Sequence, residues 1–232
     1  MPKCSQQSRR ISPMRKVLIG TPAHDGRVDV WYCNSLVNTI KLAANYSVQV
    51  DPIYMAYDSL VQRARNDLVR LALEGNYDDL IFIDSDQEWN PEWVFQLLSK
   101  PVDVVGAPVV KKSDNESYNI KMLPTGLVKD EHGLMEVAGV GTGMLRLSRP
   151  ALEAVWAVSE PYTNEGRDGR WVFDVRIVAG ELVSEDNIIC HKWRETGGKV
   201  FVDPSMTCSH VGIKKYTGNF EAFLRGLNLV AP

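Results

Sequence analysis

Residues 79–86 read DLIFIDSD, and this stretch decides the fold that we expect. The nearly continuous apolar run at residues 79–83 indicates a strand covered on both faces, as in the central sheet of an α/β protein. Asp84-Ser85-Asp86 follows directly, at the carboxyl end of that strand, where open α/β sheets bind their ligands. Residues two apart in an extended segment point to the same side, so Asp84 and Asp86 can face one ligand.

Strand and helix signals alternate on both sides of this stretch. Strands are predicted at residues 16–20, 48–53 and 102–107, and helices at about 30–46, at 58–74 and from Pro91 onward. We expect Pro22 to break the first strand into a loop and Gly75 to end the second helix. This order predicts an α/β fold with a doubly wound, mostly parallel sheet and helices on both faces.

Residues 111–232 have shorter strand candidates and longer polar segments, and we expect them to form a smaller α+β half. The strand candidates at 143–147, 171–175 and 200–202 are short, and the polar segments 111–118 and 159–170 are typical of mobile loops. Ser184 is expected to cap a helix that runs to about Glu195 and stops at Gly197-Gly198. A last helix is expected at residues 218–229.

Composition excludes several classes of protein. The 26 lysines and arginines against 29 aspartates and glutamates give a formal net charge of −3, so no global basic field is present to hold nucleic acid or an anionic membrane. No apolar run approaches the ~20 residues that span a bilayer. The four cysteines show no CxxC pairing, and residues 1–16 lack the apolar stretch of a secretory signal. We therefore expect a soluble cytoplasmic protein, with an arm at residues 1–15 and one domain at 16–232, in an oligomeric state that the sequence leaves open.

The pair Asp84 and Asp86 is the first candidate for chemistry. Hard carboxylate oxygens suit Mg²⁺ or Mn²⁺ bridging the phosphates of a nucleotide, and a solvated turn is the structural alternative. A calcium-binding EF-hand loop is excluded, because Trp89 occupies the position that needs glycine and Phe95 the one that needs a bidentate glutamate.

Two residues elsewhere are candidates for the same site. Arg65 falls at the edge of the apolar face of helix 58–74, so it pairs with a carboxylate of the acidic stretch or with a nucleotide, or it snorkels to solvent. His210 follows the last strand of the sheet and can return to its carboxyl edge as a metal ligand. A zinc site is disfavoured, because the usual ligand spacing is absent from Cys190, His191, Cys208 and His210.

Two further motifs lie in the second half. Glu185 and Asp186 fall in the first turn of a predicted helix, where the macrodipole favours acids, and either can also serve as a general base. Residues 139–143 (GVGTG) superficially resemble a dinucleotide fingerprint, but they precede a strand instead of opening a helix, so we reject a cofactor site. We expect these glycines to allow close backbone approach to a substrate or to form a tight bend.

In combination, the chain resembles the small GT-A fold glycosyltransferases, enzymes that use nucleotide sugars, in the compact form found in large DNA viruses and bacteriophages. The resemblance covers about residues 16–212. Its carriers, in chain order, are Thr21-Pro22, Ala64-Arg65-Asn66, the segment from Phe82 to Asp86, Gly141-Thr142-Gly143, Glu185-Asp186 and His210.

The resemblance implies a metal-dependent transfer of sugar from a nucleotide-diphosphate sugar to an acceptor hydroxyl, with inversion at the anomeric carbon. Asp86 and His210 would hold Mn²⁺ or Mg²⁺, and Asp84 would touch the ribose or the metal. Asp186 would be the base and Glu185 its helper. The remaining nucleotide-binding positions would be Thr21, Pro22, Arg65, Asn66 and Ser85.

The resemblance also divides the chain into a nucleotide-binding half, residues 16–110, and an acceptor and metal-completing half, residues 111–232. Segments 111–118 and 159–170 are expected to flank the acceptor cleft and to order when substrate binds. Trp171 would stack on a sugar or base, or else belong to the core. By the resemblance, the acceptor would be a glycan or a modified nucleic-acid base. Lys111, Lys112, Arg167 and Arg170 make both segments locally basic, which keeps a phosphate-bearing acceptor such as DNA open.

Two alternatives stay open. A nucleotidyltransferase shares a metal, a nucleotide and an α/β sheet, but usually has a glycine-rich loop after the first strand, where this chain has TPAHDGR. A non-catalytic module that binds nucleotide sugars or carbohydrates would keep the acidic stretch and release no diphosphate.

Overall fold

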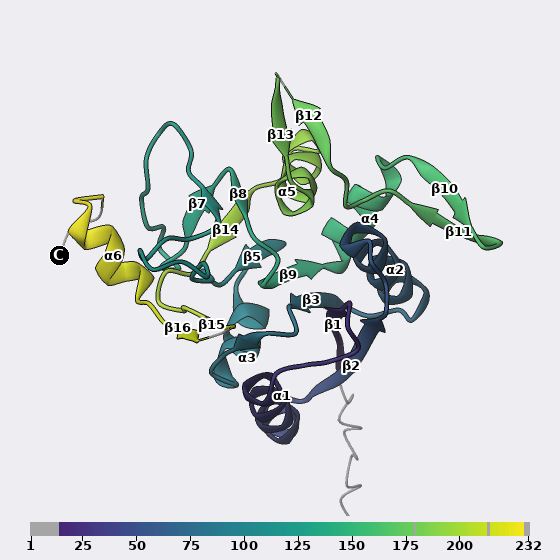
Figure 1. The fold of residues 1–232 in the computed structure, drawn as a ribbon, viewed down its shortest axis with the longest axis horizontal. Coiled ribbons are helices and arrows are strands. Elements are labelled where there is room, and N and C mark those ends of the chain that lie inside the picture. The colour runs from purple at the N-terminus through teal and green to yellow at the C-terminus, as the bar shows by residue number, and fades with distance from the viewer. Residues whose placement is uncertain (1–13, 179, 213, 230–232) are drawn as a thin grey trace, which may run out of the picture.

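The computed structural model describes residues 14–178, 180–212 and 214–229, and the predicted arm at residues 1–15 lies almost wholly outside them. A seven-stranded sheet forms the centre, in the order β2-β1-β3-β9-β5-β14-β7 (Figure 1). Strands β9 and β7 run antiparallel to their neighbours, and the other five run parallel to one another. The strands in sheet order are β2 (Val48–Ala56), β1 (Arg15–Ala23), β3 (Asp79–Ile83), β9 (Met144–Ser148), β5 (Val104–Gly106), β14 (Val200–Val202) and β7 (Met135–Val137).

Helices cover both faces of the sheet, which confirms the predicted fold class. On one face lie α1 (Val30–Ala43), with its 3₁₀ extension Ala44–Tyr46, and α3 (Glu92–Ser99). On the other lie α2 (Val61–Glu74), α4 (Arg149–Ala157) and α5 (Glu185–Glu195). Strand β3 is buried throughout and joins the two layers, because Leu80 and Phe82 pack into one apolar cluster while Ile81 and Ile83 pack into the other. This two-sided burial is why its sequence is almost wholly apolar.

Strands β3 and β14 coincide with their predicted ranges, but β1 is longer than expected. It continues through Pro22 to Ala23 instead of breaking, with Pro22 opposite Met55 of β2. Its pairing with β3 ends at Gly20, so beyond that point β1 has a neighbour on one side only. A strand edge tolerates a proline, because the missing N–H removes no ladder hydrogen bond there.

Helix α2 begins at Val61, three residues after the predicted start. The Asp58 carboxylate instead accepts hydrogen bonds from the Leu60 backbone and the Arg63 side chain, which fixes residues 58–60 outside the helix. Gly75 ends the helix as predicted but keeps a right-handed φ of −77°, and Asn76 takes the left-handed conformation at φ 53°. Glycine is needed at 75 for space, since a Cβ there would lie 2.5 Å from the Tyr77 ring.

Several expectations for the second half are wrong. Residues 159–170, predicted as a loop, form the hairpin β10 (Pro161–Asn164) and β11 (Arg167–Arg170), and residues 171–175 are not a strand. Left-handed Glu165 and Gly166 turn the hairpin. A second hairpin, β12 (Arg176–Val178) and β13 (Glu181–Val183), precedes α5, and α4 was not predicted at all. Ser184 precedes α5, but its hydroxyl accepts a hydrogen bond from the Asn187 amide instead of capping the helix.

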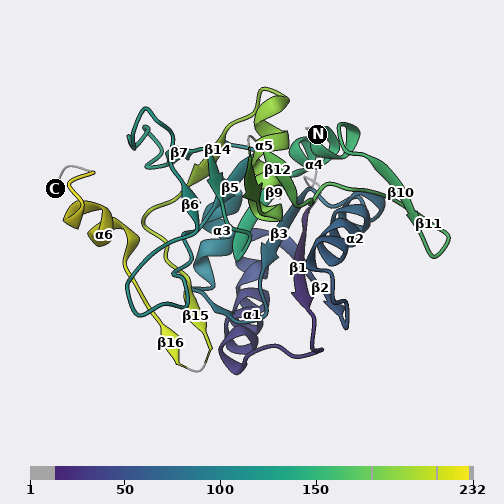
Figure 2. The same cartoon turned by 45° about the horizontal axis from the view of Figure 1, so that its top comes forward.

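Small sheets complete the fold. Strand β15 (Ser209–Val211) lies between β16 (Lys215–Tyr216) and β4 (Gln87–Glu88), and β6 (Ile120–Lys121) pairs with β8 (Gly139–Val140). Helix α6 (Phe220–Gly226) is shorter than predicted and lies at the opposite end of the molecule from the β10–β11 hairpin (Figure 2). Among the helices of the described residues, none is both long and apolar enough to cross a membrane.

Candidate functional site

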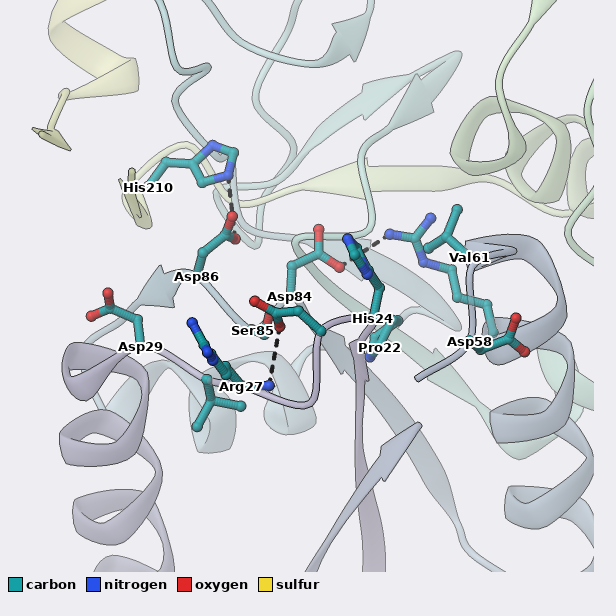
Figure 3. Close-up of a pocket in the computed structure, with 13 residues that line it drawn as sticks. Pro22, His24, Arg27, Asp29, Asp58, Val61, Asp84, Ser85, Asp86 and His210 are labelled. Atoms are coloured by element: carbon teal, nitrogen blue, oxygen red, sulfur yellow. Dashed lines mark hydrogen bonds and ion pairs between the residues drawn. The ribbon is translucent and has the colours of Figure 1, made fainter. Parts of the chain in front are cut away.

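The carboxyl ends of β1 and β3 open into a cavity of about 580 Å³ (Figure 3). Asp84, Ser85 and Asp86 line it together with the loop that follows β1, the start of α2, and His210. These parts are far apart in the sequence. They meet because parallel strands all end at the same edge of the sheet.

His210 reaches this edge through the small sheet, where it pairs with Gln87 across β15 and β4. Its Nε2 lies 3.3 Å from Oδ1 of Asp86, and Figure 3 shows the two side chains facing each other. The imidazole Nδ1 lies 3.0 Å from the Val110 carbonyl oxygen, which can only accept, so Nδ1 carries a proton. The other Asp86 oxygen is 2.5 Å from the Lys112 ammonium. Burial would raise the pKa of Asp86, but hydrogen bonds from His210 and Lys112 outweigh it and hold the pKa well below its ordinary value.

Arg65 is buried and forms ion pairs with two of the acidic side chains. From α2 it donates to Asp84 Oδ1 at 3.0 Å and to Glu185 Oε1 at 2.6 Å, a residue 120 positions away. Burial would lower the pKa of the guanidinium, but Asp84, Asp186 and Glu185 reverse the effect and raise it. The predicted pairing of Arg65 with a carboxylate of the acidic stretch is confirmed, and its second partner, Glu185, was not predicted.

Asp186 lies on a second cavity of about 360 Å³, which it shares with Gln87, Thr142 and Lys111. Asp84 and His210 line both cavities, so the two form one site. The Asp186 carboxylate accepts a hydrogen bond from the Asn119 amide at 2.8 Å. Burial raises the pKa of Asp186 above its ordinary value, with Arg65 opposing the rise and Glu185 adding to it.

Antiparallel β9 explains how the GVGTG stretch comes to this site. Because β9 runs against β3, its first residue, Met144, lies opposite Ile83 at the end of β3. The carbonyl of Gly143 then accepts the backbone N–H of Asp84 at 3.3 Å. Thr142 and Gly143 both line the second cavity.

The predicted nucleotide-binding residues divide into two groups. Pro22, Ser85 and Arg65 line the larger cavity. Thr21 is fully buried and shares a hydrogen bond with the Tyr32 hydroxyl, and Asn66 is buried with its amide bonded in both directions to the Phe173 backbone. Thr21 and Asn66 therefore do not line the larger cavity, and they stabilise the structure around it through these buried hydrogen bonds.

Sequence reasoning missed most of the loop after β1 and one residue beside Asp186. The cavity is lined by His24, Asp25, Arg27 and Asp29 of that loop and by Asp58. A polar run directly after the first strand was the signal that could have found the loop. Asn119 had no local signal, because only the sheet order brings it to Asp186.

The two segments expected to flank one acceptor cleft border different cavities. Lys111 and Lys112 line the cavity that holds Asp186, whereas the β10–β11 hairpin borders a cavity of about 200 Å³ beside α2 and the end of β2. Trp171 packs edge-on against Tyr162 and donates to Asp174, outside both parts of the site. The two segments therefore lie at different cavities, and the cavity at the hairpin adjoins the larger cavity through Asp58.

The described residues hold no cluster of three or more histidine, cysteine, aspartate or glutamate side chains placed to bind a metal ion. Asp86 and His210 form a pair, and the Asp84 carboxylate accepts a hydrogen bond from Arg65 instead.

No model of a known protein family matches the chain, and no curated protein matches it. Among solved structures, A197 from STIV aligns over 86% of both chains with 18% identity and a TM-score of 0.55. The chain shares its fold with that protein. Two more distant structures are a glycosyltransferase involved in the glycosylation of the major capsid of PBCV-1 (TM-score 0.34, 13% identity, 63% of this chain and 67% of that one) and mannose-1-phosphate geranyltransferase from Thermus thermophilus (TM-score 0.36, 12% identity, 61% and 59%). At such scores, neither structure decides a function.

Proposed function

We propose that this protein is a divalent-metal-dependent glycosyltransferase that moves a sugar from a nucleotide-diphosphate sugar to an acceptor hydroxyl, with inversion. The observation that carries the proposal is the divided site: two cavities share Asp84 and His210, and buried Arg65 joins the carboxylates of the first to the acidic pair Glu185 and Asp186 of the second. A donor can lie in the larger cavity with its transferred group beside Asp186.

The charge of the larger cavity supports a metal requirement. Its lining carries five carboxylates, Asp25, Asp29, Asp58, Asp84 and Asp86, against Arg27 and Arg65, while Arg63 and Lys112 pair with two of the five from outside the lining. The carboxylates still outnumber these four cations, so a metal ion would favour a diphosphate there, and Mg²⁺ in nucleotide sites is commonly held by one or two carboxylates plus the phosphates themselves.

The residues present fit such an ion. Nδ1 of His210 faces the Val110 carbonyl, so Nε2, 3.3 Å from an Asp86 oxygen, is the ring nitrogen that would bind an ion, in place of the proton that Nε2 shares with Asp86 in their hydrogen bond. Asp86 and His210 would hold the ion, and its bound charge would stabilise the departing nucleoside diphosphate. The Lys112 ammonium already pairs with the other Asp86 oxygen, so this carboxylate lies beside a positive charge before any ion binds.

Asp186 is the better candidate for the base. Glu185 is held in an ion pair with Arg65 at 2.6 Å, whereas the bond that Asp186 accepts from Asn119 comes from a neutral amide. In the proposed step Asp186 takes the proton of the acceptor hydroxyl, the acceptor oxygen bonds to the anomeric carbon, and the bond to the diphosphate oxygen breaks. A single displacement of this kind inverts the anomeric configuration.

The acceptor side points to a neutral glycan. A cavity of about 680 Å³ beside α5 shares Asn119 with the Asp186 cavity, and its charges balance, with Lys121 and Arg194 against Glu181 and Glu195. The basic residues expected to attract a nucleic acid are dispersed: Lys112 pairs with Asp86, while Arg167 and Arg170 belong to the β10–β11 hairpin. Within the described part of the chain, these side chains do not form one positive surface for a polyanion.

The deciding experiment incubates the protein with a panel of nucleotide sugars and Mn²⁺, with and without chelator, and identifies the products. Metal-dependent release of a nucleoside diphosphate by the wild type, and its loss in Asp186→Asn, support the proposal. Release of a sugar 1-phosphate would instead indicate transfer of the nucleotidyl group. Metal-dependent thermal stabilisation by a nucleotide sugar without any release would indicate a non-catalytic binding module.

A further inference from the structure

The Asn119 side chain passes close to Gly141 and donates a hydrogen bond to Asp186. It lies just before β6 and beside Gly141, whose backbone N–H donates to the Asn119 carbonyl at 2.9 Å. From there the side chain extends past Gly141 and its Nδ2 donates to Asp186 Oδ2 at 2.8 Å. The contact joins residues 67 positions apart, from the β6 region to the first turn of α5.

Gly141 leaves the room for this side chain. A Cβ at Gly141 would lie 2.9 Å from Asn119 Nδ2 and 3.3 Å from Asn119 Cβ. The glycine does not have the positive φ that would itself require glycine, so alanine can adopt its backbone conformation. What alanine cannot do is leave the Asn119 amide where it is, because the amide is the flexible end that has to move.

We infer that Asn119 is the positioning residue of Asp186, and that position 141 is glycine to let the Asn119 amide reach that carboxylate. The inference rests on the proposed function, in which Asp186 is the base. A neutral amide donor fixes the direction of the carboxylate without the ion pair that engages Glu185.

The hydrogen bond from Asn119 bears on the pKa of Asp186. Burial raises the pKa of Asp186, and a donor to the ionised carboxylate works in the opposite direction. The titratable and charged groups around Asp186 are Arg65 on α2, Glu185 and the buried thiol of Cys190 on α5, and, around the shared cavity, Asp84, Lys111, Lys112 and His210. The Asp186 backbone N–H and the Ser184 side chain also lower the pKa of Asp186 through hydrogen bonds, and Asn119 adds a further neutral donor to the carboxylate.

The first test needs no substrate. Carboxyl ¹³C titration by NMR of the ligand-free protein, with the Asp186 resonance assigned by its loss in Asp186→Asn, compares the wild type with Asn119→Ala and Gly141→Ala. Both variants are expected to raise the pKa of Asp186 by about one pH unit. The double variant should shift it no further, because both changes remove the same hydrogen bond. Gly226→Ala is the matched control, since a Cβ there meets nothing within 4 Å.

The second test is the pH profile of kcat. Asn119→Ala and Gly141→Ala should each lower kcat about tenfold and move the acid limb upward, with the donor KM unchanged. An unmoved Asp186 titration in both variants overturns the inference, and a lower melting temperature alongside it would make the contact merely structural. If the wild type transfers no sugar from any donor, the proposed function fails while the titration still decides the positioning.

Discussion

Replacing Arg65 by methionine tests whether the buried guanidinium holds the acidic site together. Arg65 is 5% exposed, and it pairs with Asp84, whose side chain is 31% exposed, and with Glu185, whose side chain is 16% exposed. Removing one member of a buried ion pair costs about 3–5 kcal/mol, because the remaining charge stays buried without a partner. Asp84 is partly screened by solvent, so we take the lower end, about 3 kcal/mol.

That loss corresponds to a fall in melting temperature of about 6–12 °C for a chain of this length. The loss should shrink as the pH falls. Asp186 has a raised pKa in the folded protein, and Arg65 is the cation that opposes the rise, so without Arg65 the Asp186 carboxylate takes up its proton at a still higher pH. Once Asp186 is protonated, the variant holds less unpaired negative charge, and its deficit relative to the wild type decreases.

Urea unfolding of the two proteins at pH 7 and at pH 5 measures both effects. Arg63→Met, on the same helix, is the control, because Arg63 is about a third exposed and its pair with Asp58 should contribute little. The reasoning is refuted if Arg65→Met destabilises no more than Arg63→Met, or if its deficit is the same at both pH values.

Four further results are expected. Asp86→Asn and His210→Ala should each abolish the Mn²⁺-dependent rise in melting temperature with a nucleotide sugar, and an unchanged rise would remove both from the metal site. Asp186→Asn should lower kcat by about 100-fold with the donor KM little changed, while Glu185→Gln is milder, and the opposite order would exchange their roles. Burial lowers the pKa of Lys192 from 10.5 to about 8, so the unfolded chain binds more protons between pH 8 and 10.5 and the free energy of unfolding should rise with pH across that window; urea unfolding of Lys192→Met should lack this rise. Finally, kcat/KM for the acceptor should change little between about 50 and 200 mM salt, and a steep loss would point to a nucleic acid.

The sequence by itself determined the centre of this protein. Residues 79–83 could be read as a strand because nearly every side chain is apolar, and only a strand buried on both faces uses such a run at that length. The same local logic located β14, α1 and most of α2. It also placed Asp84 and Asp86 at the binding edge, because that edge is defined by where the central strand ends.

Tertiary structure decided the short and polar elements. The hairpin at residues 161–170, helix α4 and the passage of β1 through Pro22 all depend on which segment lies alongside, and a local pattern does not contain that information. The insertion of β9 between β3 and β5 is of the same kind, and it alone brings Gly143 to the carboxyl end of β3.

The site shows the same division. Residue types and strand ends were enough to nominate Asp84, Asp86 and His210, and amphipathicity was enough to place Arg65 near a carboxylate. The choice of Asp186 over Glu185 came from the family resemblance. The contacts of Arg65 with Glu185 and of Asn119 with Asp186 were beyond reach, since they join residues 120 and 67 positions apart. Such distances are closed only by the order of strands in the sheet and the packing of helices on it, which are set by the burial of the whole apolar surface and not by any one segment.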